Sequence, residues 1–486
     1  MKRVRSPSGK ALYRVLPRSV ADMSAEQVAF HQRARLQGAI VAAVAQNGYA
    51  DTTIKQLVSL AGVSRSAFYK LFSGKEQCFL STYDLIAGMA SERIARAYRE
   101  PDDWREQLRA AFACFGQIVD EERDASHLVL VDALGVGPRV LERRERIIGE
   151  FELMLRQSFD RAPEPATVSE VTIHAIVAGI RRVAYRRLLR GEPERLGELV
   201  GELLAWALHY HAPGVEPPVR PPVAETKTPP SLRQTLQETA IAPLDPALAR
   251  GKLPHRERIL NAVVSLASEG GYPALSIPAI SARAGISNEA FYEHFTDKQD
   301  AFLTAFDEAA QRATIPTAQA FLAAPTWPAA VHAAIRALLE HIVTDHVFAR
   351  LAFFEILTGT AAAIDRAEQS LDTFTTMLAP GYQAHPHVPE VVGEAIIGGL
   401  WSTIQREVGY GRAARLPELA PELTYIVLTP FIGAEQAAQG RAGRWAGSPN
   451  RRAPLRPPQR GSAAPRDRPR RYRQCECPRA ALDMQL

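Results

Sequence analysis

The chain has 486 residues, of which 46% are hydrophobic and 23% charged, and its formal net charge is +5. This length predicts about three or four compact domains, and the composition is ordinary for a soluble globular protein. No apolar run approaches the roughly 20 residues that span a bilayer, and the N-terminus lacks the apolar core of a secretory signal, so we expect a cytoplasmic protein without a membrane partner.

Residues 1–30 are predicted to form a flexible basic arm, and residues 31–80 a small helical domain. In that domain a first apolar-periodic helix ends at Gly48, where a left-handed residue is needed. Thr52 or Thr53 then caps a second helix, because a hydroxyl oxygen accepts a hydrogen bond from a free N–H of the first turn.

A tight turn and a short third helix complete this domain as a helix-turn-helix. Gly62 permits the turn, and Ser64 stands as the cap of the third helix. The expected core side chains are Ile54, Leu57, Val63, Phe68 and Phe72. The side chains left outside, where they can meet a major groove, are Arg65, Ser66, Tyr69 and Lys70.

Residues 254–303 repeat this DNA-binding domain without a gap. Gly48 recurs as Gly271 and Lys75 as Lys298, so the offset is 271 − 48 = 298 − 75 = 223 residues. The repeated helix caps are Ser276 and Ser287, and the outer residues of the repeated third helix are Asn288, Glu289, Tyr292 and Glu293. Such a match predicts a duplicated unit within one chain.

A helical regulatory domain is predicted to follow each DNA-binding domain, or head, at residues 81–211 and 304–440. The duplication continues there, since Trp104 pairs with Trp327 at offset 223 and Gly179 with Gly399 at 399 − 179 = 220. Aromatic side chains of both domains can line ligand pockets, although an aromatic at helical spacing is more often ordinary core. They are Phe112, Phe115, Phe151, Tyr185 and Trp206, with Phe348, Phe353, Phe354, Phe374 and Trp401 in the second copy.

Two segments interrupt the helical pattern. Residues 212–253 are rich in proline and are predicted to be a linker. Extended at roughly 3.1 Å per residue, part of it spans the roughly 34–36 Å between half-sites on DNA. Residues 441–486 carry twelve Arg against three acidic residues, a net charge of 12 − 3 = +9. This Arg- and Pro-rich tail is predicted to be disordered, and it either attracts phosphates without sequence preference or has no function.

The first head contains the motif Ala-Gly-Val-Ser-x-x-Ala-x-Tyr-x-x-Phe-x-x-Lys, from Ala61 to Lys75. With a long helical domain behind it, this motif resembles the TetR family of bacterial one-component transcription regulators. The resemblance implies an all-α fold of two tandem units, each a three-helix DNA-binding head followed by a helical ligand-binding and dimerisation domain. It also implies double-stranded operator DNA and a small apolar effector as partners, and no cofactor.

The resemblance assigns roles to the outer residues of both heads. It implies phosphate contacts from Tyr69, Tyr292, Lys75 and Lys298, and from the cap positions Thr53 and Ser276. Positions that approach base edges are Arg65, Ser66, Asn288 and Glu289, of which Arg65 suits guanine and Asn288 adenine. Ser64, Lys70, Ser287 and His294 complete the predicted DNA-binding set, the two serines mainly as caps.

The second head departs from the first in charge. Glu289 and Glu293 repel phosphate unless one of them accepts a hydrogen bond from cytosine. The family's common small residue is replaced by Ser66 and Glu289, and Leu71 stands where the second copy has His294. Three alternatives stay open for the second head: a DNA-binding domain equal to the first, a weaker one, or a structural domain.

The last two predicted helices of each unit match the dimerisation pair of the family. They cover residues 170–189 with 194–210, and residues 391–408 with 417–436. In single-unit regulators two chains pack such helices into a four-helix bundle. Two arrangements stay open here: an intramolecular pseudo-dimer on an asymmetric operator, and a homodimer with four heads that uses mainly the first.

An enzyme and a non-specific architectural DNA binder are the competing classes. The closely spaced histidines lack the i, i+4 spacing with a nearby carboxylate that a metal site favours, and there is no phosphate loop or nucleophile elbow. Cys475 and Cys477 have no partner pair. We predict no catalytic residue and no metal site. The sequence favours a DNA-binding transcriptional regulator, a ligand-responsive repressor, over binding driven by the tail alone.

Overall fold

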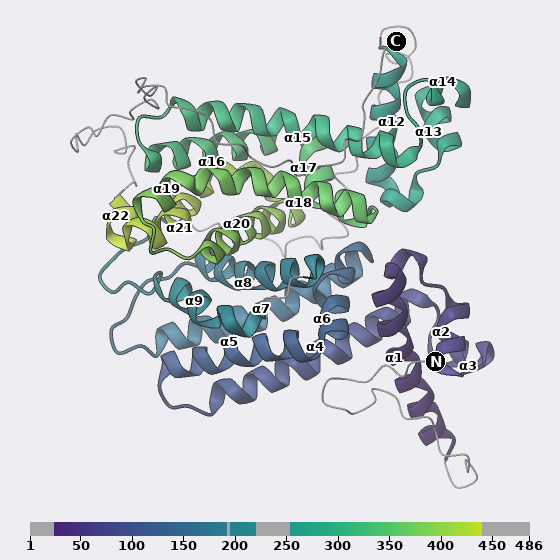
Figure 1. Ribbon diagram of the computed structural model, residues 1–486, viewed down its shortest axis with the longest axis horizontal. Coiled ribbons are helices and arrows are strands. Elements are labelled where there is room, and N and C mark those ends of the chain that lie inside the picture. The colour runs from purple at the N-terminus through teal and green to yellow at the C-terminus, as the bar shows by residue number, and fades with distance from the viewer. Residues whose placement is uncertain (1–23, 192–194, 220–252, 440–486) are drawn as a thin grey trace, which may run out of the picture. The chain divides into compact units, whose positions relative to one another are not determined.

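The computed structural model describes residues 24–191, 195–219 and 253–439. Every regular element in these ranges is a helix, which confirms the predicted all-α fold (Figure 1). None of the described helices is long and apolar enough to cross a bilayer. Most of the predicted arm and linker, and the whole Arg-rich tail, lie outside the described residues.

The first unit contains the described residues up to 219. Its helices are α1 (Ala25–Asp51), α2 (Ile54–Ala61), α3 (Arg65–Leu71), α4 (Lys75–Arg99), α5 (Trp104–Glu121), α6 (Arg123–Leu130), η1 (Asp132–Gly135), α7 (Pro138–Asp160), α8 (Glu170–Arg190) and α9 (Leu196–Leu208). The head consists of α1 to α3, and α4 continues from the head into the regulatory domain, so the predicted boundary at residue 80 falls inside a helix.

The second unit contains the described residues from 253. Its head is α12 (His255–Gly270), η2 (Tyr272–Ala274), α13 (Ile277–Ala284) and α14 (Asn288–Tyr292). Its regulatory domain is α15 (Lys298–Ala323), α16 (Trp327–Thr344), α17 (His346–Phe353), η3 (Glu355–Thr358), α18 (Ala361–Thr375), η4 (Thr376–Leu378), α19 (Ala379–Ala384), α20 (Glu390–Gly409), η5 (Ala413–Leu419), α21 (Ala420–Ile432) and α22 (Ala434–Ala438).

Local capping starts the second helix of each head where the sequence predicts it. Thr53 and Gln56 form a capping box, in which the Gln56 N–H donates to Thr53 Oγ1 at 3.3 Å and the Thr53 N–H donates to Gln56 Oε1 at 2.7 Å. In the second head the Ala279 N–H donates to Ser276 Oγ at 3.3 Å. Of the two threonines considered, Thr53 is therefore the cap.

The helix-turn-helix turns and their cores also agree with the prediction. Gly62 (φ 57°) and Gly285 (φ 65°) end α2 and α13 in the left-handed region that glycine adopts without strain. The predicted core residues are buried or half-buried: Leu57, Val63, Phe68, Phe72, Ile280, Phe291 and Phe295 are buried, and Ile54, Ile277 and Ile286 are half-buried.

Two segments of the second unit are more broken than the first. The counterpart of α7 is divided into α18, η4 and α19. The single helix predicted over residues 417–436 is wrong, because that range contains η5, α21 and α22. Gly433, with φ 82°, separates the last two of these helices, since a positive φ does not continue an α-helix.

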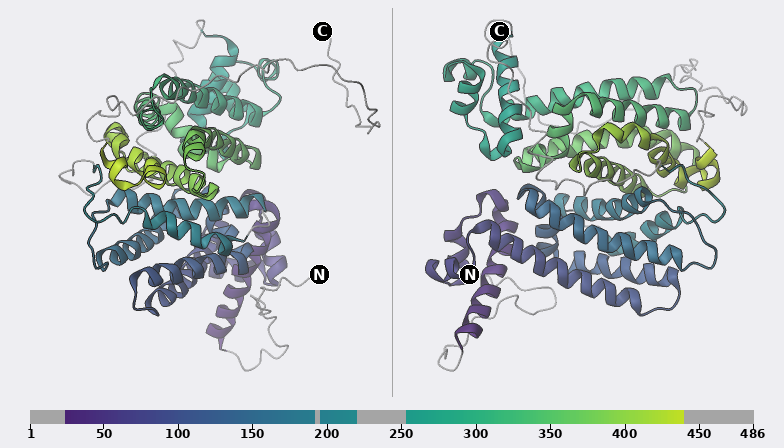
Figure 2. Two further views of the ribbon diagram at one scale, coloured as in Figure 1. Left: turned by 60° about the vertical axis from the view of Figure 1, so that its left-hand side comes forward. Right: turned by 180° about the vertical axis from the view of Figure 1, so that it is seen from behind.

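The two units meet along α8 and α20, which lie side by side (Figures 1 and 2). Their backbones approach closely at two glycines: a Cβ on Gly179 would lie 2.4 Å from the Ala395 carbonyl oxygen, and a Cβ on Gly399 would lie 2.4 Å from the Ala175 carbonyl oxygen. Residues 175 and 179 correspond to 395 and 399 at offset 220. The contact is therefore reciprocal, as in a two-fold interface.

Polar contacts extend this helix pair. Arg182 donates to both carboxylate oxygens of Glu368 at 2.6 Å, and Arg406 donates to Glu152 at 3.1 Å. Deep in the interface, Tyr210 donates through its hydroxyl to the Ile426 carbonyl at 2.8 Å. Both units thus share buried hydrogen bonds, so that breaking the interface leaves polar groups unpaired.

Replacing Gly179 by alanine is predicted to destabilise the protein. The added methyl group meets the Ala395 carbonyl, and overpacking of this kind costs about 1–3 kcal/mol. Gly201→Ala is the matched control, because a Cβ at Gly201 meets nothing within 4 Å and alanine favours a helix. Urea unfolding of both variants measures the difference; equal or higher stability of Gly179→Ala would contradict the close contact.

Candidate nucleic-acid interface and ligand cavity

The third helix of the first head has one buried and one exposed face. The Ala67 N–H donates to Ser64 Oγ at 3.1 Å, which confirms the predicted cap of α3. Phe68 is fully buried, whereas the predicted DNA-facing residues Arg65, Ser66, Tyr69 and Lys70 are exposed. Since Arg65 and Lys70 are cations, this face suits phosphate and guanine.

The second head presents the corresponding face with a different charge. Ser287 caps α14 by accepting from the Ala290 N–H at 3.1 Å. Asn288, Glu289 and Tyr292 are exposed on α14, and His294 is exposed beyond its end. With Glu289 and Glu293 in place of Ser66 and Lys70, this face lacks the cations of the first. The two recognition helices are therefore unlike in chemistry.

Lys75 and Lys298 have structural contacts that the sequence prediction did not include. Lys75 Nζ donates to the carbonyls of Tyr49 at 2.7 Å and Ala50 at 3.1 Å and lies 4.3 Å from the Tyr49 ring centroid. Lys298 Nζ donates to the Leu275 carbonyl at 2.9 Å and lies 4.6 Å from the Tyr272 ring centroid. Both ammonium groups hold the segment before the second helix, so the predicted phosphate contact is at most one of their functions.

The surroundings of Lys75 agree with this structural function. Burial lowers the pKa of its ammonium group, and Asp51 opposes that shift. The side-chain oxygens of Thr53 and Ser276 likewise accept the capping hydrogen bonds of α2 and α13, although both residues remain exposed. Because a hydroxyl group can still donate its hydrogen, a phosphate contact from these two residues stays a prediction.

Two arginines that were not predicted from the sequence form hydrogen bonds to the turns of the two heads. Arg35 donates to the Gly62 carbonyl at 3.3 Å, and Arg258 donates to the Gly285 carbonyl at 2.6 Å. They correspond to each other, since 258 − 35 = 223. The same offset that revealed the repeat was therefore the signal for this pair. These contacts hold the turn that precedes each recognition helix.

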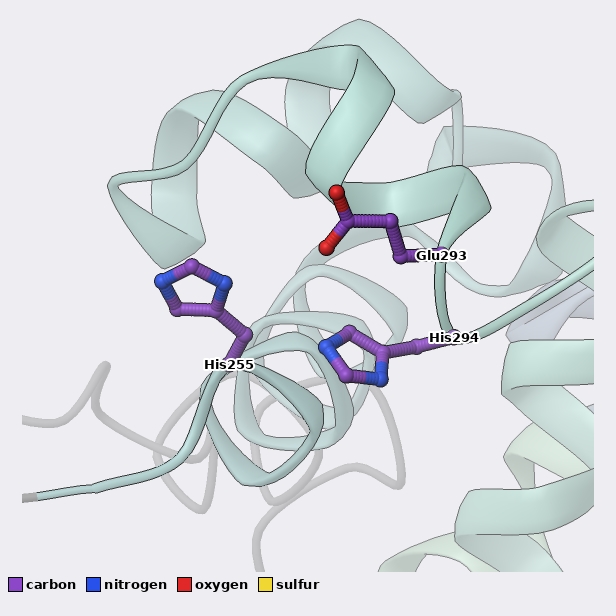
Figure 3. A group of neighbouring side chains, drawn as sticks. All are labelled: His255, Glu293 and His294. Carbon is purple, nitrogen blue, oxygen red and sulfur yellow. The ribbon is translucent and has the colours of Figure 1, made fainter.

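A group of possible metal ligands also escaped the sequence analysis. The ligand atoms of His255, Glu293 and His294 all lie within 4.8 Å of one another (Figure 3), and all three residues are exposed. His255 begins α12, at a separation of 294 − 255 = 39 residues from His294, so no local motif marks the group. It offers three ligands, fewer than the four of a structural zinc site.

Each regulatory domain contains a cavity. That of the first unit measures about 140 Å³ and is lined by residues of α4, α5, α6, α7 and α8. That of the second unit measures about 70 Å³. Of the predicted aromatic residues, Phe112, Phe115, Phe151, Phe374 and Trp401 line these cavities. The other five, Tyr185, Trp206, Phe348, Phe353 and Phe354, do not line them.

Comparison with known proteins places both heads in one family. The sequence profile described as "Bacterial regulatory proteins, tetR family" matches residues 38–82 and again residues 259–305. The HTH-type transcriptional repressor KstR of Mycolicibacterium smegmatis is 23% identical over 188 residues, which cover 37% of this chain and 88% of the repressor. Little more than a third of this chain thus corresponds to nearly a whole repressor.

Solved structures similar to part of the chain are regulators as well. The fatty acid degradation regulator FadR of Bacillus halodurans has a TM-score of 0.35 at 15% identity, over 36% of this chain and 94% of that protein. The transcriptional regulator FadR of Bacillus subtilis, solved with stearoyl-CoA, has a TM-score of 0.34 at 15% identity, over 36% of this chain and 96% of that protein.

Two lysine substitutions are predicted to distinguish a lysine that stabilises the fold from a lysine that contacts DNA. Lys75→Met removes the donor to two backbone carbonyls and is expected to lower the free energy of unfolding by about 1–2 kcal/mol. Lys70→Met, at an exposed position, is expected to change stability by less than about 0.5 kcal/mol. It should instead weaken binding to a random-sequence duplex and reduce the salt slope by about one.

Urea unfolding and binding titrations at several salt concentrations measure both effects. A Lys75→Met variant of unchanged stability whose salt slope falls by about one would instead identify Lys75 as a phosphate contact.

Proposed function

Because this chain belongs to the TetR family and carries two units of that family in tandem, we propose that it is a ligand-responsive transcriptional repressor that works as a single-chain pseudo-dimer. Its two units pair with each other, and the unlike helices α3 and α14 read an asymmetric operator. Arg65, Ser66, Asn288 and Glu289 approach base edges, while Tyr69 and Tyr292 contact phosphates.

The reciprocal contact of α8 and α20 is the observation that carries this proposal. Ala175 meets Gly399, and Ala395 meets Gly179, so each unit offers the other the same pair of positions. An isologous interface between two chains has this property, in which residue i contacts j and j contacts i. The chain therefore has within itself the kind of contact that two identical chains make in a symmetric dimer.

The charges along this interface favour unlike partners. Arg186 and Arg190 of α8 each lie 3.0 Å from Asp372, and Arg187 lies 3.1 Å from Glu394. The residues that correspond to Asp372 and Glu394 in the first unit are Gly149 and His174, at offsets of 223 and 220. Two first units in contact would thus lack these acceptors for the arginines of α8, whereas a first and a second unit supply them.

The helix α4 provides a physical route from the cavity to the head. It begins at Lys75, which is bonded to the end of α1, and it lines the cavity of the first unit through Tyr83, Ala87 and Ile94. A molecule that enters the cavity must displace or repack these side chains, because protein interiors are close-packed. A shift of α4 then moves the head and changes the distance between the two recognition helices.

The second candidate is a homodimer with four heads, in which the first unit of one chain pairs with the second unit of its partner. The same charge pairs serve that arrangement, since they require only unlike units. The solution mass distinguishes the two. We expect a mass near 53.3 kDa, the mass of one chain, both free and after subtraction of one bound duplex. Native mass spectrometry measures it, and a mass of two chains would favour the four-headed dimer.

Each recognition helix is predicted to contribute to one half of the operator. Tyr69→Phe and Tyr292→Phe each remove a hydroxyl that donates to phosphate, and each is expected to weaken operator binding on the order of tenfold. Footprints on an operator selected from genomic fragments should lose protection at one half-site with Tyr69→Phe and at the other with Tyr292→Phe.

Both tyrosines are exposed, so thermal melting of the variants should match the parent and serves as the control. An unchanged affinity of Tyr292→Phe, with symmetric protection, would identify the second head as a structural domain.

A further inference from the structure

The cavity of the first unit has an apolar body and a cationic end. Its lining is almost entirely apolar and includes Phe112, Phe115 and Phe151. Its charged lining residues are Arg144 of α7 and Arg181 of α8, and none of the described Asp or Glu residues lines it. An apolar pocket with a few convergent polar groups is the usual form of a small-molecule site.

Arg181 makes neither a hydrogen bond nor an ion pair within the described part of the chain. Its Nε is buried and unbonded, and no ion pair reaches its guanidinium group. Arg144, in contrast, donates to Glu145 Oε1 at 3.1 Å and to Gln405 Oε1 at 3.0 Å. Burial lowers the pKa of Arg181 to about 9, with Arg144 as the second cause, so Arg181 is still a cation at neutral pH. The Glu145 carboxylate lies close enough to favour the charged form of Arg181, but it already accepts a hydrogen bond from Arg144. A buried cation without a direct ion pair is costly.

The second unit shows that the fold does not require these two charges. At offset 220 Arg181 corresponds to Trp401, which lines the cavity of the second unit, and at offset 223 Arg144 corresponds to Ala367. None of the residues that line the second cavity is charged. Since the second copy has an indole ring at this position, the repeated fold does not by itself require a charge there.

We propose that the cavity of the first unit binds an amphipathic anion, an apolar molecule with one acidic head group, and that the head group pairs with Arg181. A guanidinium fork matches a carboxylate with two parallel hydrogen bonds. The cavity of the second unit, smaller and without charge, does not take such a ligand. As an identification of the effector this rests on the proposed function, and it adds an acidic head group to the small apolar effector expected from the sequence.

Arg144 connects this site to the interface between the units. The amide of Gln405, a residue of α20, accepts from Arg144 and donates to the Phe353 carbonyl at 2.6 Å. An anion that draws Arg144 toward the cavity therefore competes with a hydrogen bond that crosses from the first unit to the second. The ligand therefore binds with different affinity when the hydrogen bond from Arg144 to Gln405 is formed and when it is broken. An effector shifts an equilibrium only through such a difference in affinity.

Calorimetric titration of the full chain with three ten-carbon probes tests the proposal. Decanoate, 1-decanol and decylammonium share an apolar body and differ in the charge of the head. We expect decanoate to bind about one molecule per chain and at least ~10-fold more tightly than decanol, with decylammonium weakest. Arg181→Met should reduce decanoate affinity at least ~10-fold and abolish the preference for decanoate over decanol, whereas Arg146→Met, at an exposed position on α7, should change neither.

The stability of the Arg181→Met variant without ligand shows whether Arg181 has a structural function. Arg181→Met is expected to raise the urea midpoint, because it removes an unpaired buried charge; a lower midpoint together with unchanged decanoate binding would show that Arg181 is structural and overturn the proposal. Failure of all three probes to bind, or equal binding of decanoate and decanol, would overturn it as well. Binding of decanoate that leaves operator affinity unchanged would support the anion site and contradict only the ligand-responsive function.

Discussion

The close approach of α8 and α20 is the contact on which the arrangement of both units depends. Glycines at 179 and 399 let each backbone reach a carbonyl of the other helix, at Ala395 and Ala175. Side chains larger than hydrogen at these two positions would force the helices apart. The buried hydrogen bonds and ion pairs around this contact, such as Arg182 with Glu368, form only when the helices lie at this distance.

Around this contact the duplicated units have kept their scaffold and changed their chemistry. Both heads retain the same internal contacts: an arginine bonded to the turn glycine and a lysine bonded to the segment before the second helix. The surfaces that meet ligands differ, since Lys70 corresponds to Glu293 and Arg181 to Trp401. A fold that is secured by repeated internal contacts tolerates such divergence, because exposed and cavity-lining side chains contribute less to its stability than the core.

The cavity and the interface share one helix in each unit. Val177, Ile180 and Arg181 of α8 line the first cavity, and Ile397, Leu400 and Trp401 of α20 line the second. The same helices also carry the contacts between the units, and Arg181 and Trp401 line a pocket that residues of both units form. A ligand in either cavity therefore lies one helix away from the surface that determines how the two heads are held, and in the first unit Arg144 bonds directly across it.

The amino-acid sequence by itself determined the helices of the two heads, the caps, the turn glycines and the repeat, because each of these signals is local or recurs at a fixed offset. Thr53, Ser64 and Gly62 act within three or four residues of their own position, so their functions could be predicted. The sequence also separated the exposed from the buried face of each recognition helix through helical periodicity.

Only the tertiary structure decided which groups the ends of the long side chains contact. Lys75 extends back to Tyr49, 75 − 49 = 26 residues away, and its ammonium group binds carbonyls that no spacing rule connects to it. Arg181 reads in sequence as one more polar residue of an amphipathic helix, yet it lies unpaired at an apolar cavity. Such placements arise from the packing of distant helices, and packing depends on the shapes of all the side chains in contact, which a linear pattern does not contain.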